Sequence, residues 1–245
     1  MRLAPSAPNT TERTRWSCLR RSNSGAFWRA CGRAVGVFLP TKRNGQAVLV
    51  VHSWWGLTDS FRTFGRSLAE AGFAVGLADL FNGRTASNAN EAKRLRSARR
   101  REPMYKTLMR NIDELRELDD ARGHVGIVGF SMGGHWAVWL SQRSDLPIRA
   151  TVLYYASRAG SFSGSHSSFL AHYAQNDPWV SNRARRRMES EIEKAGRPYT
   201  AFDYPGTGHW FAESDRPGDY APTAAALALE RTLIHLRETL GTAHR

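Results

Sequence analysis

The sequence predicts an α/β fold, with a mostly parallel, twisted sheet and helices on both of its faces. Three observations support this prediction. Short apolar runs alternate with longer amphipathic stretches from about residue 32 to the end of the chain. Most of these runs are separated by helix-length segments, which imply βαβ units and parallel strands. Hydrophobic residues make up 41% of the chain and charged residues 23%, which is ordinary for a globular protein.

Seven apolar segments are expected to form the strands, at 34–39, 47–51, 73–78, 125–129, 151–155, 168–173 and 200–204. Segments with helical spacing of their apolar residues are expected as helices at 59–71, 88–119, 132–143, 181–195 and 220–240. Pro103 is expected to divide the long segment into two helices, because proline lacks the N–H that a helix interior needs.

The net charge of +13 is concentrated in two segments. Residues 1–33 hold seven arginines against one glutamate, and residues 84–110 hold nine lysines or arginines against two glutamates. The remainder is balanced, so the charge does not indicate a nucleic-acid-binding core. Either basic segment could still contact an acidic surface.

Residues 1–31 are expected to be a basic, disordered N-terminal extension, and residues 32–245 one folded domain. The Arg- and Ser-rich composition of the extension also fits an organellar transit peptide. Both cysteines, Cys18 and Cys31, lie in the extension, so the domain itself offers no thiol and no zinc spacing. No run of about 18 apolar residues is present, and no membrane span is expected.

The stretch VGFSMGGHW, residues 128–136, carries the strongest chemical signal in the chain. Gly129–Phe130–Ser131–Met132–Gly133 is a G-x-S-x-G motif between an apolar strand and a helix. In a nucleophile elbow the serine is held in a strained turn, and small residues two positions before and after it avoid collisions with neighbouring backbone. We therefore expect Ser131 to be a nucleophile rather than a turn-forming serine.

A catalytic serine needs a base and a carboxylate that orients the base. Asp177 ends a predicted strand in the stretch AHYAQNDPWV, and His209 follows the next strand in YPGTGHWF. Ser131, Asp177 and His209 should therefore meet at the carboxyl edge of the sheet. Asp203 and Asp215 are rival acids, but the first lies within a strand and the second follows the histidine too closely.

Backbone amides are expected to stabilise the oxyanion that forms during acyl transfer. One amide is that of Met132, at the start of the helix after the nucleophile. The other is that of Trp54, in the loop after the strand of VLVVHSWWGL.

These stretches, together with GLADLF and YPGTGHWFAESDRPGDY, resemble the dienelactone hydrolase family of α/β hydrolases from about residue 33 to residue 240. The resemblance implies hydrolysis of enol lactones or other small esters without a metal or cofactor. Two positions depart from the family. Ser131 stands where the family usually has a cysteine nucleophile, and Ser53 stands where it has a glutamate that helps to ionise that cysteine. A serine needs no such help, because the histidine deprotonates it during attack.

Several further residues are expected at the substrate. Aromatic side chains next to the triad suggest an apolar pocket for a small acyl group or lactone ring. The resemblance also implies that arginines hold the carboxylate of a carboxylated lactone, and Arg84 and Arg216 match approximately in location. The expected substrate-binding residues are Ser53, Trp55, Arg84, Trp179, Trp210 and Arg216.

The leading prediction is therefore a cytoplasmic serine hydrolase of small carboxylic esters or lactones. One alternative is a dienelactone hydrolase (carboxymethylenebutenolidase) in the strict sense. The other is a non-catalytic relative that binds a small ligand. We expect a small-molecule ester or lactone as the partner, no nucleic acid or membrane, and a monomer or homodimer.

Overall fold

The computed structural model describes residues 19–21, 27–31, 35–42, 44–98, 101–118 and 123–241. Its strands form a nine-stranded sheet in the order β1-β2-β3-β5-β4-β6-β7-β8-β9. The strands are β1 (Leu19–Arg21), β2 (Phe27–Cys31), β3 (Val35–Leu39), β4 (Ala47–Val51), β5 (Ala74–Ala78), β6 (Val125–Phe130), β7 (Ile148–Tyr154), β8 (Ser168–Asn176) and β9 (Tyr199–Gly208). All pairs from β5 to β9 are parallel, and β1, β2 and β3 add an antiparallel edge.

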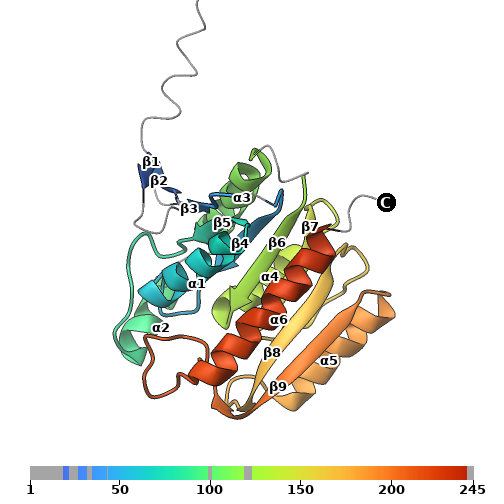
Figure 1. Ribbon diagram of the computed structural model, residues 1–245. Helices are drawn as coiled ribbons and strands as arrows, with labels where there is room; N and C mark the ends of the chain where they lie inside the picture. The colour runs from blue at the N-terminus through green and yellow to red at the C-terminus, as the bar shows by residue number, and fades with distance from the viewer. Residues whose placement is uncertain are drawn as a thin grey trace, which may run out of the picture.

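Helices cover both faces of this sheet, as the sequence predicts. They are α1 (Asp59–Glu70), α2 (Ala89–Ala98), α3 (Arg101–Arg116), α4 (Met132–Ser141), α5 (Asn182–Lys194) and α6 (Pro222–Gly241). Figure 1 shows α1 and α6 in front of the sheet and α3, α4 and α5 behind it. α2 lies near the end toward which the arrowheads of the central strands point.

The central strands are apolar along their whole length because both of their faces are buried. In β4 every residue is buried. Leu49 and Val51 belong to the apolar cluster with α3, α4 and α5, whereas Val48 and Val50 belong to the cluster with α1 and α6. Two apolar layers therefore clamp the sheet and fix the positions of its strand ends.

Several predicted boundaries differ from the structure, and one predicted division is confirmed. Residues 1–31, predicted to be disordered, include strands β1 and β2, and the rest of that segment lies outside the described residues. The division of 88–119 is confirmed, although Pro103 lies in the first turn of α3, where its missing N–H leaves no helix bond unmade. β9 continues to Gly208 rather than ending at Tyr204.

None of the helices that the structure describes is long and apolar enough to cross a membrane.

Candidate active site

The turn between β6 and α4 holds Ser131 in a strained backbone conformation. Its φ and ψ angles are 50° and −111°, a combination that residues with a side chain rarely adopt. The Ser131 N–H donates to the Tyr154 carbonyl of the neighbouring strand at 3.0 Å, and the Ser131 carbonyl accepts from the His135 N–H at 3.2 Å. These bonds keep the strained residue at the tip of the turn.

Glycines around Ser131 are required by close backbone contacts. A Cβ at Gly133 would lie 2.2 Å from the Val51 carbonyl oxygen, and one at Gly129 would lie 2.5 Å from the Gly133 carbonyl oxygen. A Cβ at Gly134 would lie 2.3 Å from the Cβ of Ala156. The three glycines therefore allow α4 to start tightly against β4, β6 and the loop after β7.

Ser131, His209 and Asp177 form a continuous chain of hydrogen bonds. Ser131 Oγ lies 2.8 Å from His209 Nε2, and His209 Nδ1 lies 2.8 Å from Asp177 Oδ2. The three residues come from the ends of β6, β9 and β8, as the sequence predicts. The structure thus brings the proposed nucleophile, base and orienting acid together.

Asp177 is fixed on its other side by the backbone. Its Oδ1 accepts hydrogen bonds from the N–H groups of Trp179 at 2.8 Å and Val180 at 3.1 Å. Only 4% of each of the Asp177 and His209 side chains is exposed. The backbone thus holds Oδ1, while Oδ2 contacts the imidazole.

The rival acid Asp203 and the buried histidines His52 and His172 have other roles. Asp203 forms an ion pair with Arg185 at 2.7 Å on β9. His52 is fully buried, accepts from the Leu80 N–H and bonds to the Ser53 carbonyl, and burial lowers its pKa to about 4. His172 is buried against Thr232 and Tyr204, and burial lowers its pKa to about 3. These imidazoles are neutral structural groups at neutral pH.

A cavity of about 520 Å³ opens beside Ser131 and His209. It is lined by Trp54, Arg96, Arg101, Met104, Ser131, Met132, His135, Trp136, Trp139, Tyr155, Arg158, Trp179, Val180, His209 and Trp210. Trp54 and Met132, the two residues predicted to supply oxyanion amides, therefore line the same cavity as the nucleophile. The predicted aromatic wall is also present: the Trp54 ring stacks on Trp210 at 5.8 Å and meets Trp179 edge-on at 5.4 Å.

The cationic residues of the cavity are not the predicted ones. Arg84 and Arg216 do not line it, and neither do Ser53 and Trp55. The Arg216 guanidinium lies over the Trp55 ring at 4.2 Å, with its Nε 3.4 Å from Asp215. That stacking turns Arg216 toward the loop after β4 and corrects its predicted position.

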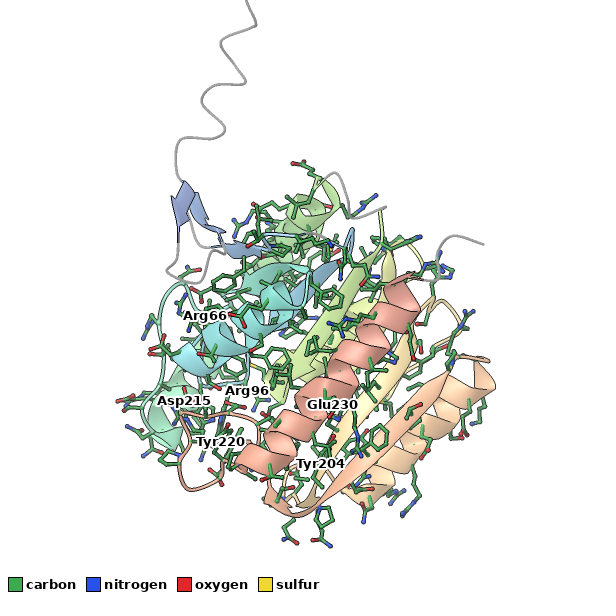
Figure 2. The ribbon with its side chains drawn as sticks, in the orientation of Figure 1. Arg66, Arg96, Tyr204, Asp215, Tyr220 and Glu230 are labelled. Atoms are coloured by element: carbon green, nitrogen blue, oxygen red, sulfur yellow. The ribbon has the colours of Figure 1, made fainter. Side chains whose placement is uncertain are left out.

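Arg96, Arg101 and Arg158 take this place in the cavity, which has no aspartate or glutamate among its lining residues. They come from α2, α3 and the loop after β7. Figure 2 shows Arg96 at the same end of the sheet as Asp215 of the loop after β9. Burial and the nearby charges of Arg158, Arg96 and His209 lower the pKa of His135. The lining is therefore electropositive.

A buried carboxyl group that sequence reasoning missed lies beside the site. Glu213 is fully buried; its Oε2 contacts the Ser53 hydroxyl at 2.9 Å and its Oε1 accepts from the Tyr155 hydroxyl at 2.9 Å. Burial raises the pKa of Glu213 to about 8, against the lowering effect of these two hydrogen bonds. Ser53 thus contacts the carboxyl group of Glu213, which is distant in the sequence.

The residues that sequence reasoning missed differ in how far the sequence could have indicated them. Arg158 follows a strand at the carboxyl edge, so the rule that placed Asp177 and His209 could also have found it. Arg96 and Arg101 lie in the basic segment already noted, but their position over the cavity depends on how α2 and α3 pack. Glu213 had no local signal, because its burial follows from the fold of the loop after β9.

The sequence profile of the dienelactone hydrolase family matches residues 34–240. The chain belongs to the dienelactone hydrolase family. This match covers the sheet from β3 onward and includes all three residues of the triad. The family assignment makes the chain a hydrolase.

Individual relatives and solved structures are similar to most of the chain. A protein of Aquifex aeolicus (strain VF5) named "Putative carboxymethylenebutenolidase" is 24% identical over 210 residues, which are 80% of this chain and 89% of that protein. The structure of a dienelactone hydrolase-like promiscuous phosphotriesterase from metagenomic libraries superposes with a TM-score of 0.74 at 17% identity, covering 90% of this chain and 96% of that one. Esterase B from Lactobacillus rhamnosis has a TM-score of 0.62 at 16% identity, covering 95% and 92%.

Proposed function

We propose that this chain is a serine hydrolase that cleaves small carboxylic esters or lactones. The observation that carries the proposal is the chain of two 2.8 Å contacts from Ser131 through His209 to Asp177. A hydroxyl within hydrogen-bonding reach of an imidazole that a buried carboxylate orients is the arrangement that acyl transfer to serine needs.

In the proposed mechanism His209 Nε2 removes the proton of Ser131 as Oγ attacks the ester or lactone carbonyl carbon. Asp177 holds the Nδ1–H tautomer and stabilises the imidazolium that forms. His209 then protonates the leaving alcohol, which a lactone keeps tethered to the acyl group. In the second half the imidazole activates water, which releases the acid and returns Ser131.

The backbone amides of Met132 and Trp54 are proposed to bind the oxyanion. Both residues line the same cavity as the nucleophile. Removing one such donor typically costs about 3–4 kcal/mol of transition-state stabilisation.

A stricter second candidate is hydrolysis of a lactone that bears a carboxylate, as the name carboxymethylenebutenolidase implies. The observation that favours it is the set Arg96, Arg101 and Arg158 in a lining without acidic residues. The assignment of substrate-anion binding passes to these arginines from Arg84 and Arg216. A non-catalytic role is disfavoured, because a binding protein has no need of the strained serine or of the oriented imidazole.

The setting of the proposed enzyme follows the sequence predictions. We propose a cytoplasmic enzyme whose partner is a small-molecule ester or lactone, without nucleic acid or membrane. Whether it acts as a monomer or a homodimer is a separate prediction, which the size of the purified protein in solution tests.

Ser131→Ala tests the proposed function. We expect turnover of p-nitrophenyl acetate to fall by at least about 10⁴-fold, because the attacking oxygen is removed. A fluorophosphonate probe should label the wild-type chain and fail to label the variant. Undiminished turnover or labelling of Ser131→Ala would refute the assignment, and a panel of neutral esters and carboxylated lactones would separate the two candidates.

A further inference from the structure

Glu213 connects three loops that carry parts of the proposed machinery. It lies four residues after His209, in the loop between β9 and α6. Its carboxyl group touches Ser53, which precedes Trp54, and Tyr155, which lines the cavity. The Tyr155 ring packs against the His209 ring, with 4.8 Å between their centroids. A single carboxyl group therefore joins the oxyanion loop to the residue behind the base.

The surroundings of Glu213 favour its neutral form. Glu213, Ser53 and Tyr155 each have an exposed fraction of 0%. Both direct partners are hydroxyls, and two charged side chains, Asp215 and Arg216, have opposite effects on the Glu213 pKa. Of the imidazoles on adjoining segments, His52 is buried and neutral, and the His209 ring packs against the Tyr155 ring.

A neutral carboxylic acid satisfies every contact in this cluster. In an ionised Glu213 both oxygens accept, Oε2 from the Ser53 hydroxyl and Oε1 from the Tyr155 hydroxyl. In the neutral acid a protonated Oε2 can instead donate to Ser53 Oγ over the same 2.9 Å, while Oε1 still accepts from Tyr155. Ser53 Oγ also lies 3.4 Å from the Trp55 N–H, which donates to it. The loop is fixed at its next residue as well, since the Ser214 N–H donates to Ser60 Oγ of α1 at 2.9 Å. Ordered hydrogen bonds of this kind hold catalytic groups in place.

We propose that Glu213, as a neutral acid, is a positioning residue that holds the Trp54 loop against Tyr155, and that its ionisation slows the reaction. The proposal rests on the proposed function, because it assigns Trp54 to the oxyanion. An ionised Glu213 would place a negative charge next to the loop that must stabilise a developing negative charge. It would also draw water into a dry contact and loosen the loop.

The test compares kcat as a function of pH for the wild type, Glu213→Gln and Glu213→Leu. In the wild type kcat should fall as the pH rises through about 8, because Glu213 ionises there. Glutamine reproduces both hydrogen bonds without ionising, so Glu213→Gln should restore most of the neutral-pH kcat and lack the alkaline fall. Glu213→Leu leaves two buried hydroxyls unpaired and should lower kcat by about tenfold, with a smaller effect on KM.

Two further variants sharpen the comparison. Glu193→Gln changes an exposed glutamate of α5 and should leave the profile as in the wild type. Asp215→Asn removes a negative neighbour that raises the Glu213 pKa, so the alkaline fall should move to lower pH. An alkaline fall that persists in Glu213→Gln would overturn the proposal, and so would a flat wild-type profile.

An infrared measurement separates this proposal from the proposed function. The C=O band of a protonated carboxylic acid should be present in the wild type at neutral pH and absent from Glu213→Gln. If the band is missing, Glu213 is ionised and the proposal fails even if the enzyme is active. If the band is present but the wild type neither hydrolyses esters nor reacts with a fluorophosphonate, the proposed function fails, and with it the kinetic effect assigned to Glu213.

Discussion

The triad and the arginines face the same cavity but are positioned differently. Ser131, Asp177 and His209 each follow directly on a strand of the parallel sheet. The three arginines project from two helices and a loop, and Arg96 and Arg101 are exposed. The ends of β6, β8 and β9 position the first set, whose bonded atoms lie 2.8 Å apart. In the second set, Arg96 and Arg101 depend on the crossover between β5 and β6, and Arg158 depends on the loop after β7. We infer that substitutions on the triad side abolish activity or folding, whereas substitutions of the arginines change which substrates are accepted.

The largest effect should come from backbone crowding at the elbow. Gly133→Ala would place its Cβ 2.2 Å from the Val51 carbonyl oxygen, which β4 holds in the sheet. We expect a loss of stability of more than about 4 kcal/mol and little soluble protein, measured by expression and by urea unfolding. The control is Gly218→Ala, because a Cβ at Gly218 meets nothing within 4 Å. Equal stability of the two variants would mean that the elbow is less constrained than the strand ends suggest.

The next effect should come from the orienting acid. Asp177→Asn keeps the size of the side chain but favours the wrong imidazole tautomer, so kcat should fall by about 10⁴-fold. Asp203→Asn is the matched control, since Asp203 pairs with Arg185 instead. Steady-state kinetics on a neutral ester measure both. If Asp203→Asn lost more activity than Asp177→Asn, the roles of the two acids would be reversed.

The smallest effect is expected on the arginine side. Arg158→Met should lower kcat/KM for a carboxylated ester by about tenfold and leave a neutral ester of the same size nearly unchanged. Arg216→Met should leave the ratio of these two rates as it is in the wild type, because Arg216 stacks on Trp55 outside the cavity. If Arg216→Met rather than Arg158→Met changed this ratio, Arg216 would be the residue that binds the substrate carboxylate.

The sequence predicted best those features that strand ends determine. The α/β fold follows from the apolar runs that form the strands. The positions of Ser131, Asp177 and His209 follow because each of these polar residues comes directly after such a run. Met132 and Trp54 could be placed in the same way, because each follows a strand end within a few residues. These are local patterns, and the parallel sheet converts them into one site.

Features that depend on side chains from distant segments could not be predicted. Arg216 was expected at the substrate because it follows His209 closely, yet its attraction to the Trp55 ring and to Asp215 decides its direction. Glu213 gave no sign of burial, since a glutamate in a polar loop is usually exposed. Only the packing of three loops brings its carboxyl group to Ser53 and Tyr155.

The tryptophans around the triad also make the intrinsic fluorescence of the protein a probe of the cavity. Trp179 is 57% exposed, yet its ring lies 5.4 Å from Trp54 and 6.3 Å from His209. An acyl group bound beside Trp179 should displace water from the Trp179 indole and leave the environment of the buried tryptophans unchanged. The intrinsic emission of the protein should therefore shift to shorter wavelength when the cavity fills, so each stage of occupancy can be followed without a dye or an added label.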